Sequence, residues 1–319
     1  MTTPAGPPNS PPAPPPTAAP SPSGPAMAGQ GPRLGLSQPF IFRQLPVRGR
    51  VVRLANLGTH IPAIKNAAQP PSHPVLGRLL AELLVLNVMF SQDLKEAEKV
   101  TLQTQSNGLV PLLVSQCTKT GHLRAYGKTM PDLPTNPGPH LFGSDGVLAV
   151  TIHLPHAQQP YQSLVPLDKP TLPALVEDYF VQSAQVPTRL MVLTAPDNHA
   201  AAAIFLQALP GETLPTDDWH RLGLLLQTIT PAELLPGEVK VETLLHRLFA
   251  EDDVEVFPAQ PLVADATSTR TRMAAALKSL GQAQCAELLT HGPITMTDEF
   301  THTTETFTTA DIQALFAAE

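Results

Sequence analysis

Residues 294–307, ITMTDEFTHTTETF, bring together the side-chain types best suited to chemistry. Asp298 and His302 are four residues apart, and a carboxylate and an imidazole are both common ligands of divalent metals such as zinc. His291 or Asp265 is available as a further ligand. The segment is also typical of a strand, a tight turn and a returning strand, and on a surface hairpin solvated polar side chains are the commoner outcome. We therefore expect no metal at this hairpin.

The two cysteines and eleven histidines form no catalytic pattern. Cys117 ends an apolar run typical of a buried strand, and Cys285 lies on the apolar side of a helix, so we expect both thiols in cores. A disulfide between them is the alternative, but disulfides are rare in cytosolic proteins. The motifs GxSxG, GxGxxG, GxxxxGK[ST], HExxH and CxxC are absent. The sequence therefore predicts a protein that is not an enzyme.

Composition restricts the partners and the location of the protein. The net charge is -7, and the 20 lysines and arginines are scattered, which argues against nucleic acid as a partner. The longest apolar run, residues 75–90, is interrupted by Arg78, Glu82 and Asn87, so we expect no membrane span. The start of the chain lacks the basic and apolar regions of a signal peptide. These features predict a cytoplasmic protein.

The first residues differ in composition from the rest of the chain. Twelve of the 37 prolines fall within residues 1–32, where apolar residues show no periodicity. Such a segment cannot bury enough apolar surface to offset the entropy lost on ordering. We predict a disordered proline-rich tail over residues 1–38, and a ligand for a proline-binding partner is the alternative.

The elements that must position these residues indicate an α+β fold. Residues 72–92 are expected to form a helix that is apolar around most of its circumference, with Ser72 as its cap and Pro74 in its first turn. Alternating residues and turn signals predict an antiparallel meander, followed by further strands and a helix capped by Thr171. The expected strands span 48–57, 99–105, 110–117, 122–128, 146–154 and 187–195.

Two smaller parts follow this α+β core, which we assign to residues 39–210. Residues 211–260 are expected to form a helical linker, in which Thr230 and Glu233 make a capping box. Residues 261–319 are expected to form a small unit of helices around the threonine-rich hairpin, closed by a last helix that Thr308 and Asp311 cap. Its expected core is Leu277, Leu280, Leu288, Ile294, Met296, Phe300, Phe307, Ile312, Leu315 and Phe316.

Four segments, taken in order, resemble one known family. They are LLVSQCTKTGHLRAYGK, EDYFVQSAQVPTRL, LLHRLFAEDDVEVFPAQP and RMAAALKSLG. Together they resemble the redox-regulated bacterial heat-shock holdase, the thirty-three-kilodalton chaperonin family, from about Arg48 to the C-terminus. The resemblance implies an ATP-independent chaperone with an α+β core, a helical linker and a C-terminal zinc domain. It implies unfolded or partly folded client proteins as partners, and a homodimer that nothing in the sequence itself indicates.

The resemblance also implies a switch, and here the sequence departs from the family. The family binds zinc through a CxC and a later CxxC, and oxidation of these thiolates releases the zinc and unfolds the linker and last domain. The corresponding positions are Ala266, Ser268, Asp298 and Thr301. None of these residues replaces a thiolate, so we expect no cofactor and no thiol switch.

Two hypotheses of different class follow. The first is a holdase whose apolar surface is exposed constitutively, or when stress unfolds a marginal linker and terminal unit. Its expected client-binding residues are Leu244, Leu248 and Phe249 in the linker, for which an ordinary buried stripe is the alternative. The second hypothesis is a non-catalytic binding or assembly module that has kept the fold without the chaperone cycle.

Overall fold

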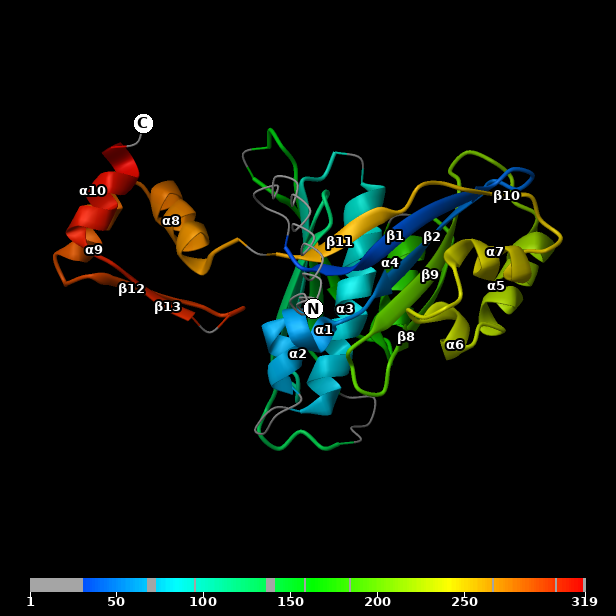
Figure 1. Ribbon diagram of the computed structural model, residues 1–319, viewed down its shortest axis with the longest axis horizontal. Helices are drawn as coiled ribbons and strands as arrows, with labels where there is room; N and C mark the ends of the chain where they lie inside the picture. Colours follow the sequence, from blue (N-terminus) through cyan, green and yellow to red (C-terminus); the bar gives the residue numbers. More distant parts are fainter. Residues whose placement is uncertain are drawn as a thin grey trace, which may run out of the picture.

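The computed structural model describes residues 31–67, 73–94, 96–135, 141–157, 159–183, 185–265, 267–301 and 303–317. One end of the molecule carries a group of helices packed on a large sheet, and the other end carries a small unit of helices and a hairpin (Figure 1). Most of the predicted tail lies outside the described residues. Its predicted end at residue 38 is wrong, because residues 33–38 belong to the first strand, in which Leu34 is buried.

The mixed α+β fold class predicted from the sequence is confirmed. The strands are β1 (Arg33–Phe42), β2 (Val47–Leu54), β3 (Lys99–Gln105), β4 (Leu112–Thr118), β5 (His122–Lys128), β6 (Val147–His153), β7 (Tyr161–Pro166), β8 (Thr188–Thr194), β9 (Ala201–Ala208), β10 (Val254–Val256) and β11 (Gln260–Ala264). Over the described residues they form one sheet in the order β7-β6-β3-β4-β5-β11-β1-β2-β9-β8, with β10 paired to β1. Neighbouring strands in this sheet are antiparallel except β11 and β5.

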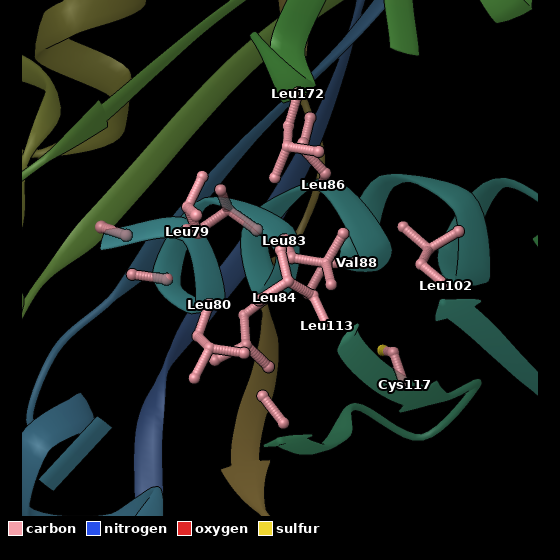
Figure 2. Packing of buried hydrophobic residues seen from close by; sticks show 14 of the residues in the cluster. Leu79, Leu80, Leu83, Leu84, Leu86, Val88, Leu102, Leu113, Cys117 and Leu172 are labelled. Carbon is pink, nitrogen blue, oxygen red and sulfur yellow. The ribbon is translucent and has the colours of Figure 1, made fainter. Parts of the chain in front are cut away.

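Helix α3 (Pro74–Asp93) lies in the centre of the main core (Figure 2). It is long and apolar enough to span a membrane, but 89% of the relevant window is buried inside the protein, as in the core helix of a globular domain. Asn87, which interrupts its apolar sequence, donates from Nδ2 to the carbonyl and hydroxyl oxygens of Ser115 on β4 at 2.8 and 3.1 Å. His73 caps the helix; the predicted cap, Ser72, lies outside the described residues. The helices α1 (Leu57–His60), α2 (Pro62–Ala67) and α4 (Leu172–Gln182) complete this layer.

Strand β9 separates two cores. Successive side chains of a strand point to opposite faces of the sheet. Accordingly Ala201, Ala203 and Phe205 join the core around α3, whereas Ala202, Ile204 and Leu206 join a second core. That second core is closed by the linker helices α5 (Thr216–Gln227), α6 (Pro231–Leu234) and α7 (Val241–Leu248). The linker thus covers the face of the β1-β2-β9 region opposite to α3.

The terminal unit contains α8 (Thr269–Leu280), α9 (Gln282–Leu289), the hairpin β12 (Ile294–Asp298) and β13 (Thr303–Phe307), and α10 (Thr309–Ala317). Its buried residues are Met273, Leu277, Cys285, Phe307 and Ile312. The predicted cap of α10 is confirmed, since the Thr308 N–H donates to Asp311 at 2.8 Å and Thr308 Oγ1 accepts from the Asp311 N–H at 3.3 Å.

Three predictions for this unit are wrong. Leu280 and Leu288 are 43% and 45% exposed; Leu280 is the last residue of α8 and Leu288 the last but one of α9, at ends of helices that leave the small core. Phe300 packs on β5 of the sheet instead of inside the unit. The unit also begins later than residue 261, because β11 is a strand of the main sheet.

Candidate functional site

The interface between the linker and the sheet brings together the three apolar residues predicted from the sequence. Leu244, Leu248 and Phe249 are 1%, 4% and 1% exposed. The Phe249 ring lies edge-on to Phe42, with ring centroids 4.9 Å apart, and 6.1 Å from the centroid of Phe40 on the same strand. Their apolar faces become accessible to another protein only when the linker leaves the sheet.

Arg53 on β2 ties the linker to the sheet by hydrogen bonds. Its Nε donates to the carbonyl oxygen of Leu234 at 2.9 Å, Nη1 to Val239 at 2.5 Å and Nη2 to Glu233 at 2.6 Å. Burial lowers the pKa of Arg53, and the nearby Glu242 carboxylate opposes that shift. Sequence analysis missed this residue, although an arginine inside the apolar strand VVRL signals a buried cation that needs acceptors.

Two further polar contacts hold the linker. Gln38 Nε2 on β1 donates to Glu242 Oε1 at 2.7 Å, and this hydrogen bond is the main cause of the lowered pKa of Glu242. Within the linker, Arg221 donates from two nitrogens to the two carboxylate oxygens of Asp252 at 2.9 and 2.7 Å. Paired bonds of this kind fix geometry more firmly than single ones.

Arg53→Ala is expected to loosen the linker without unfolding the core. The substitution leaves three carbonyl groups without their donor, and an unsatisfied buried acceptor costs about 1–3 kcal/mol. We expect the free energy of linker release to fall by about 3 kcal/mol. The single tryptophan, Trp219 on α5, reports release through its fluorescence during heating.

Arg43→Ala is the matched control for that experiment. Arg43 lies just after β1 and its side chain is 55% exposed, with ion pairs to Asp253 and Glu255. Exposed pairs contribute about 0–1 kcal/mol, so the fluorescence transition is expected to stay close to that of the unmodified protein. Equal transitions in the Arg53 and Arg43 variants would contradict the role given to Arg53.

The positions that correspond to the family's zinc ligands carry hydrogen bonds and an ion pair. Ser268 Oγ caps α8 by accepting from the Thr271 N–H at 3.1 Å. Asp298 Oδ2 lies 2.7 Å from Arg272 Nη2, and Thr301 Oγ1 lies 3.0 Å from the hydroxyl of Thr269. Ala266 lies outside the described residues. A hydroxyl used as a helix cap and a carboxylate paired with an arginine are poor zinc donors, so these residues do not fit the ion.

The alternative metal set is not assembled either, as far as the structure describes it. Asp265 lies 3.6 Å from Arg272 and 4.0 Å from Arg124, and His302 falls outside the described residues. Burial opposes ionisation of Asp298, but hydrogen bonds from Arg272 and from the Phe300 N–H outweigh it and lower its pKa. Both carboxylates are therefore held by arginines.

The hairpin tip contacts the main sheet. Phe300 lies under the Arg124 guanidinium, with the ring centroid 4.1 Å from Cζ, and its ring centroid is 6.1 Å from that of Tyr126. Lys128, at the end of the same strand, is 3.0 Å from Glu299. The tip thus docks along β5 through an aromatic ring and charged groups.

The cysteines belong to separate cores, and both thiols are free. Cys117 lies in the main core, where Ser91 Oγ is 2.8 Å from its sulfur, and burial raises its pKa to about 12. Cys285 lies in the core of the terminal unit and donates to the Leu277 carbonyl oxygen at 3.3 Å. A disulfide within the chain is incompatible with these separate positions.

Comparison with known proteins gives consistent matches. Residues 36–308 match the family model described as Hsp33 protein. The chain is 34% identical over 289 residues to the 33 kDa chaperonin of Pseudomonas paraeruginosa, covering 88% of this chain and 94% of that protein. It is 35% identical over 280 residues to the 33 kDa chaperonin of Shewanella sp. (strain MR-4), covering 87% and 94%.

A solved structure shows the same fold. The crystal structure of the 33 kDa chaperonin (heat shock protein 33 homolog) from Thermotoga maritima matches with a TM-score of 0.67 at 21% identity. The match covers 90% of this chain and 98% of that one.

Proposed function

This chain belongs to the Hsp33 protein family, and from that premise we propose that it is an ATP-independent holdase whose linker covers the client-binding surface. Its clients are unfolded or partly folded proteins, and it acts in the cytoplasm without catalysing a reaction. The observation that carries the proposal is the second core. Linker and sheet bury a continuous apolar surface there, which release of the linker would present to a client.

Leu244, Leu248 and Phe249 are the proposed client contacts on the linker side. Their partners on the sheet, including Phe40, Phe42, Val51 and Ile204, are apolar as well. Release would therefore expose two complementary apolar surfaces together. A surface that is buried in the resting state and exposed under stress suits a protein that must not bind folded partners.

The trigger proposed here is heat or another destabilising stress, without zinc and without a thiol switch. The absence of a zinc-binding donor set among Ser268, Asp298 and Thr301 supports the loss of the metal. The raised pKa of Cys117 and the burial of Cys285 support the loss of thiol chemistry, because the thiolate is the reactive form. A homodimer remains a proposal drawn from the family resemblance.

Light scattering from a thermally unfolding client tests this function. We expect the protein to suppress aggregation without ATP under reducing conditions, at once or after preheating. The variant Cys117→Ala/Cys285→Ala is expected to suppress aggregation equally, and added peroxide or zinc is expected to change neither protein's activity.

Two outcomes would count against the proposal. If suppression of aggregation requires peroxide and is lost in the cysteine-free variant, oxidation of a thiol is the trigger, contrary to the proposal. Failure to suppress aggregation under every condition, with a folded protein that binds no apolar dye on mild heating, would favour the binding or assembly module instead.

A further inference from the structure

Strand β11 is an interior strand of the sheet although it comes late in the chain. It is the last strand of the sheet along the chain, yet it lies between β5 and β1 in the interior of the sheet. Among the described strands, β5 and β1 are each paired with β11 and not with each other. The five-residue segment QPLVA therefore joins the block β7-β6-β3-β4-β5 to the block β1-β2-β9-β8 (Figure 1).

The backbone pairing of β11 is short for an interior strand. Its parallel register with β5 contains two residue pairs, Val263 with His122 and Ala264 with Leu123, whereas β3 and β4 share seven. Its antiparallel register with β1 is interrupted by a bulge between Arg33 and Gly35. Pro261 has no N–H to donate. Because few backbone hydrogen bonds hold this strand, we count it among the segments of the sheet that open most easily.

Both ends of β11 continue into parts that the proposed function requires to move. On its N-terminal side the chain leads back through β10 to the linker helix α7. On its C-terminal side Asp265 donates its N–H to the Leu123 carbonyl oxygen at 2.8 Å, and α8 of the terminal unit follows. Unfolding of either neighbour removes a restraint on β11. The segment is therefore positioned to leave the sheet when the linker and terminal unit unfold.

We propose that the place of β11 is a strand-acceptor site, in which an extended client segment pairs with β5 and β1 once β11 has left. This inference rests on the proposed holdase function and names the conformation of client it recognises. Exposed strand edges bind extended peptides through main-chain hydrogen bonds, and side-chain pockets give the preference. The bonds now made by the Val263 N–H to Gly121 O at 2.9 Å and the Ala264 N–H to Pro32 O at 2.8 Å define the acceptors.

The side chains of β11 define the preferred sequence. Leu262 and Ala264 are 0% and 5% exposed and point into the main core, whereas Pro261 and Val263 are more accessible. Gly121 has φ of +84° and would place a Cβ atom 2.5 Å from the Pro261 carbonyl oxygen, so glycine leaves space for the incoming backbone. The site therefore takes a large apolar residue followed two positions later by a small one.

A peptide with the sequence of residues 258–266, PAQPLVADA, tests the site on the full-length protein. We expect a fluorescently labelled copy to bind on mild heating, as an increase in anisotropy. A copy carrying Leu262→Asp and Ala264→Asp is expected to bind about tenfold more weakly or worse. In the protein, Gly121→Ala is expected to weaken peptide binding, because the alanine Cβ would lie where the backbone of the incoming peptide must pass.

A cross-linked variant gives the decisive comparison. His122→Cys/Val263→Cys places two thiols at paired positions, so that oxidation fixes β11 to β5. We expect the oxidised variant to lose peptide binding by about tenfold or more, and reduction to restore it. Thr151→Cys/Gln162→Cys is the matched control, since it joins the paired strands β6 and β7 elsewhere in the sheet.

Equal peptide binding by the oxidised and reduced forms of the His122/Val263 variant would overturn the proposal. So would equal binding of the wild-type and Asp-substituted peptides, or no binding below the temperature of global unfolding. If the cross-link does not form, the comparison of the two peptides and the Gly121→Ala protein still tests whether the strand-acceptor site exists. Client light scattering is recorded separately. If the cross-linked protein still suppresses aggregation, the holdase function stands and the strand-acceptor site is not needed for it. If the wild-type protein fails to suppress aggregation, the holdase function is contradicted, and peptide binding still tests the strand-acceptor site.

Discussion

Phe249→Ala is expected to lower the free energy of linker release by about 3–5 kcal/mol, the range for removing a buried aromatic ring. The ring is 1% exposed and packs against Phe40 and Phe42 on β1, so its loss leaves a cavity between linker and sheet. Trp219 fluorescence and binding of an apolar dye are expected to change at a distinctly lower temperature than in the unmodified protein. Hydrogen exchange in α3 should stay slow, because that helix belongs to the other core.

Two controls accompany this variant. Phe249→Leu keeps most of the buried volume and is expected to cost less than half as much. Leu224→Ala removes an apolar side chain from the same linker, but that side chain is 50% exposed, so little change is expected. Unaltered transitions in Phe249→Ala, or an equal shift in Leu224→Ala, would show that the ring does not hold the linker.

The Phe249→Ala variant also distinguishes two roles of the Phe249 ring, which are covering the apolar surface of the sheet and contacting the client protein. If Phe249 also contacts clients, Phe249→Ala suppresses aggregation at lower temperature than the unmodified protein but less completely once the linker is fully released in both. If the ring only covers the sheet, suppression at full release is equal. Titrating the chaperone against a fixed amount of client above both transitions distinguishes these outcomes.

The parts of the fold that were predictable are those with a clear one-sided pattern. In the meander over residues 99–128, β3 and β5 alternate apolar and polar residues, as expected of strands with one face on the core. Strand β9, AAAIFLQA, gives no such pattern because both of its faces are buried. Strand β11 was missed because it is short, contains Pro261, and pairs with segments more than a hundred residues away in the chain.

The candidate site shows the same limit. Leu244, Leu248 and Phe249 were identifiable from the spacing of a single helix, and all three lie in the covered interface. Arg53 and Arg272 were not, because their roles depend on carbonyl groups and a carboxylate that the fold brings from distant segments. Knowledge of the missing zinc ligands indicated where the terminal unit needs another source of stability. It did not indicate that Asp298 is paired with an arginine from α8.

Asp298→Ala is expected to destabilise the terminal unit, but by less than the about 3–5 kcal/mol expected for a fully uncompensated buried charge, because Arg272 loses its partner at 2.7 Å and keeps Asp265 at 3.6 Å. The Arg272 and Asp298 side chains are 19% and 9% exposed and 2.7 Å apart, so this ion pair is much more buried than the surface ion pairs that contribute little to stability. Faster hydrogen exchange over residues 269–317 measures the effect. Glu287→Gln, which changes an exposed carboxylate on α9 of the same unit, is the control and should leave exchange unaltered.

A double-mutant cycle then decides what the pair contributes. Arg272→Met alone removes the nearest counter-charge of Asp298, with Arg124 as the remaining nearby cation, and is expected to destabilise as much as Asp298→Ala. Arg272→Met/Asp298→Leu removes both charges, and is expected to recover most of the loss because well-packed apolar side chains replace a buried ion pair at little cost. Recovery would assign the loss to uncompensated charge, and heat-activated suppression should then return to its original temperature. Additive losses would contradict this coupling and leave the terminal unit's stability to its small apolar core.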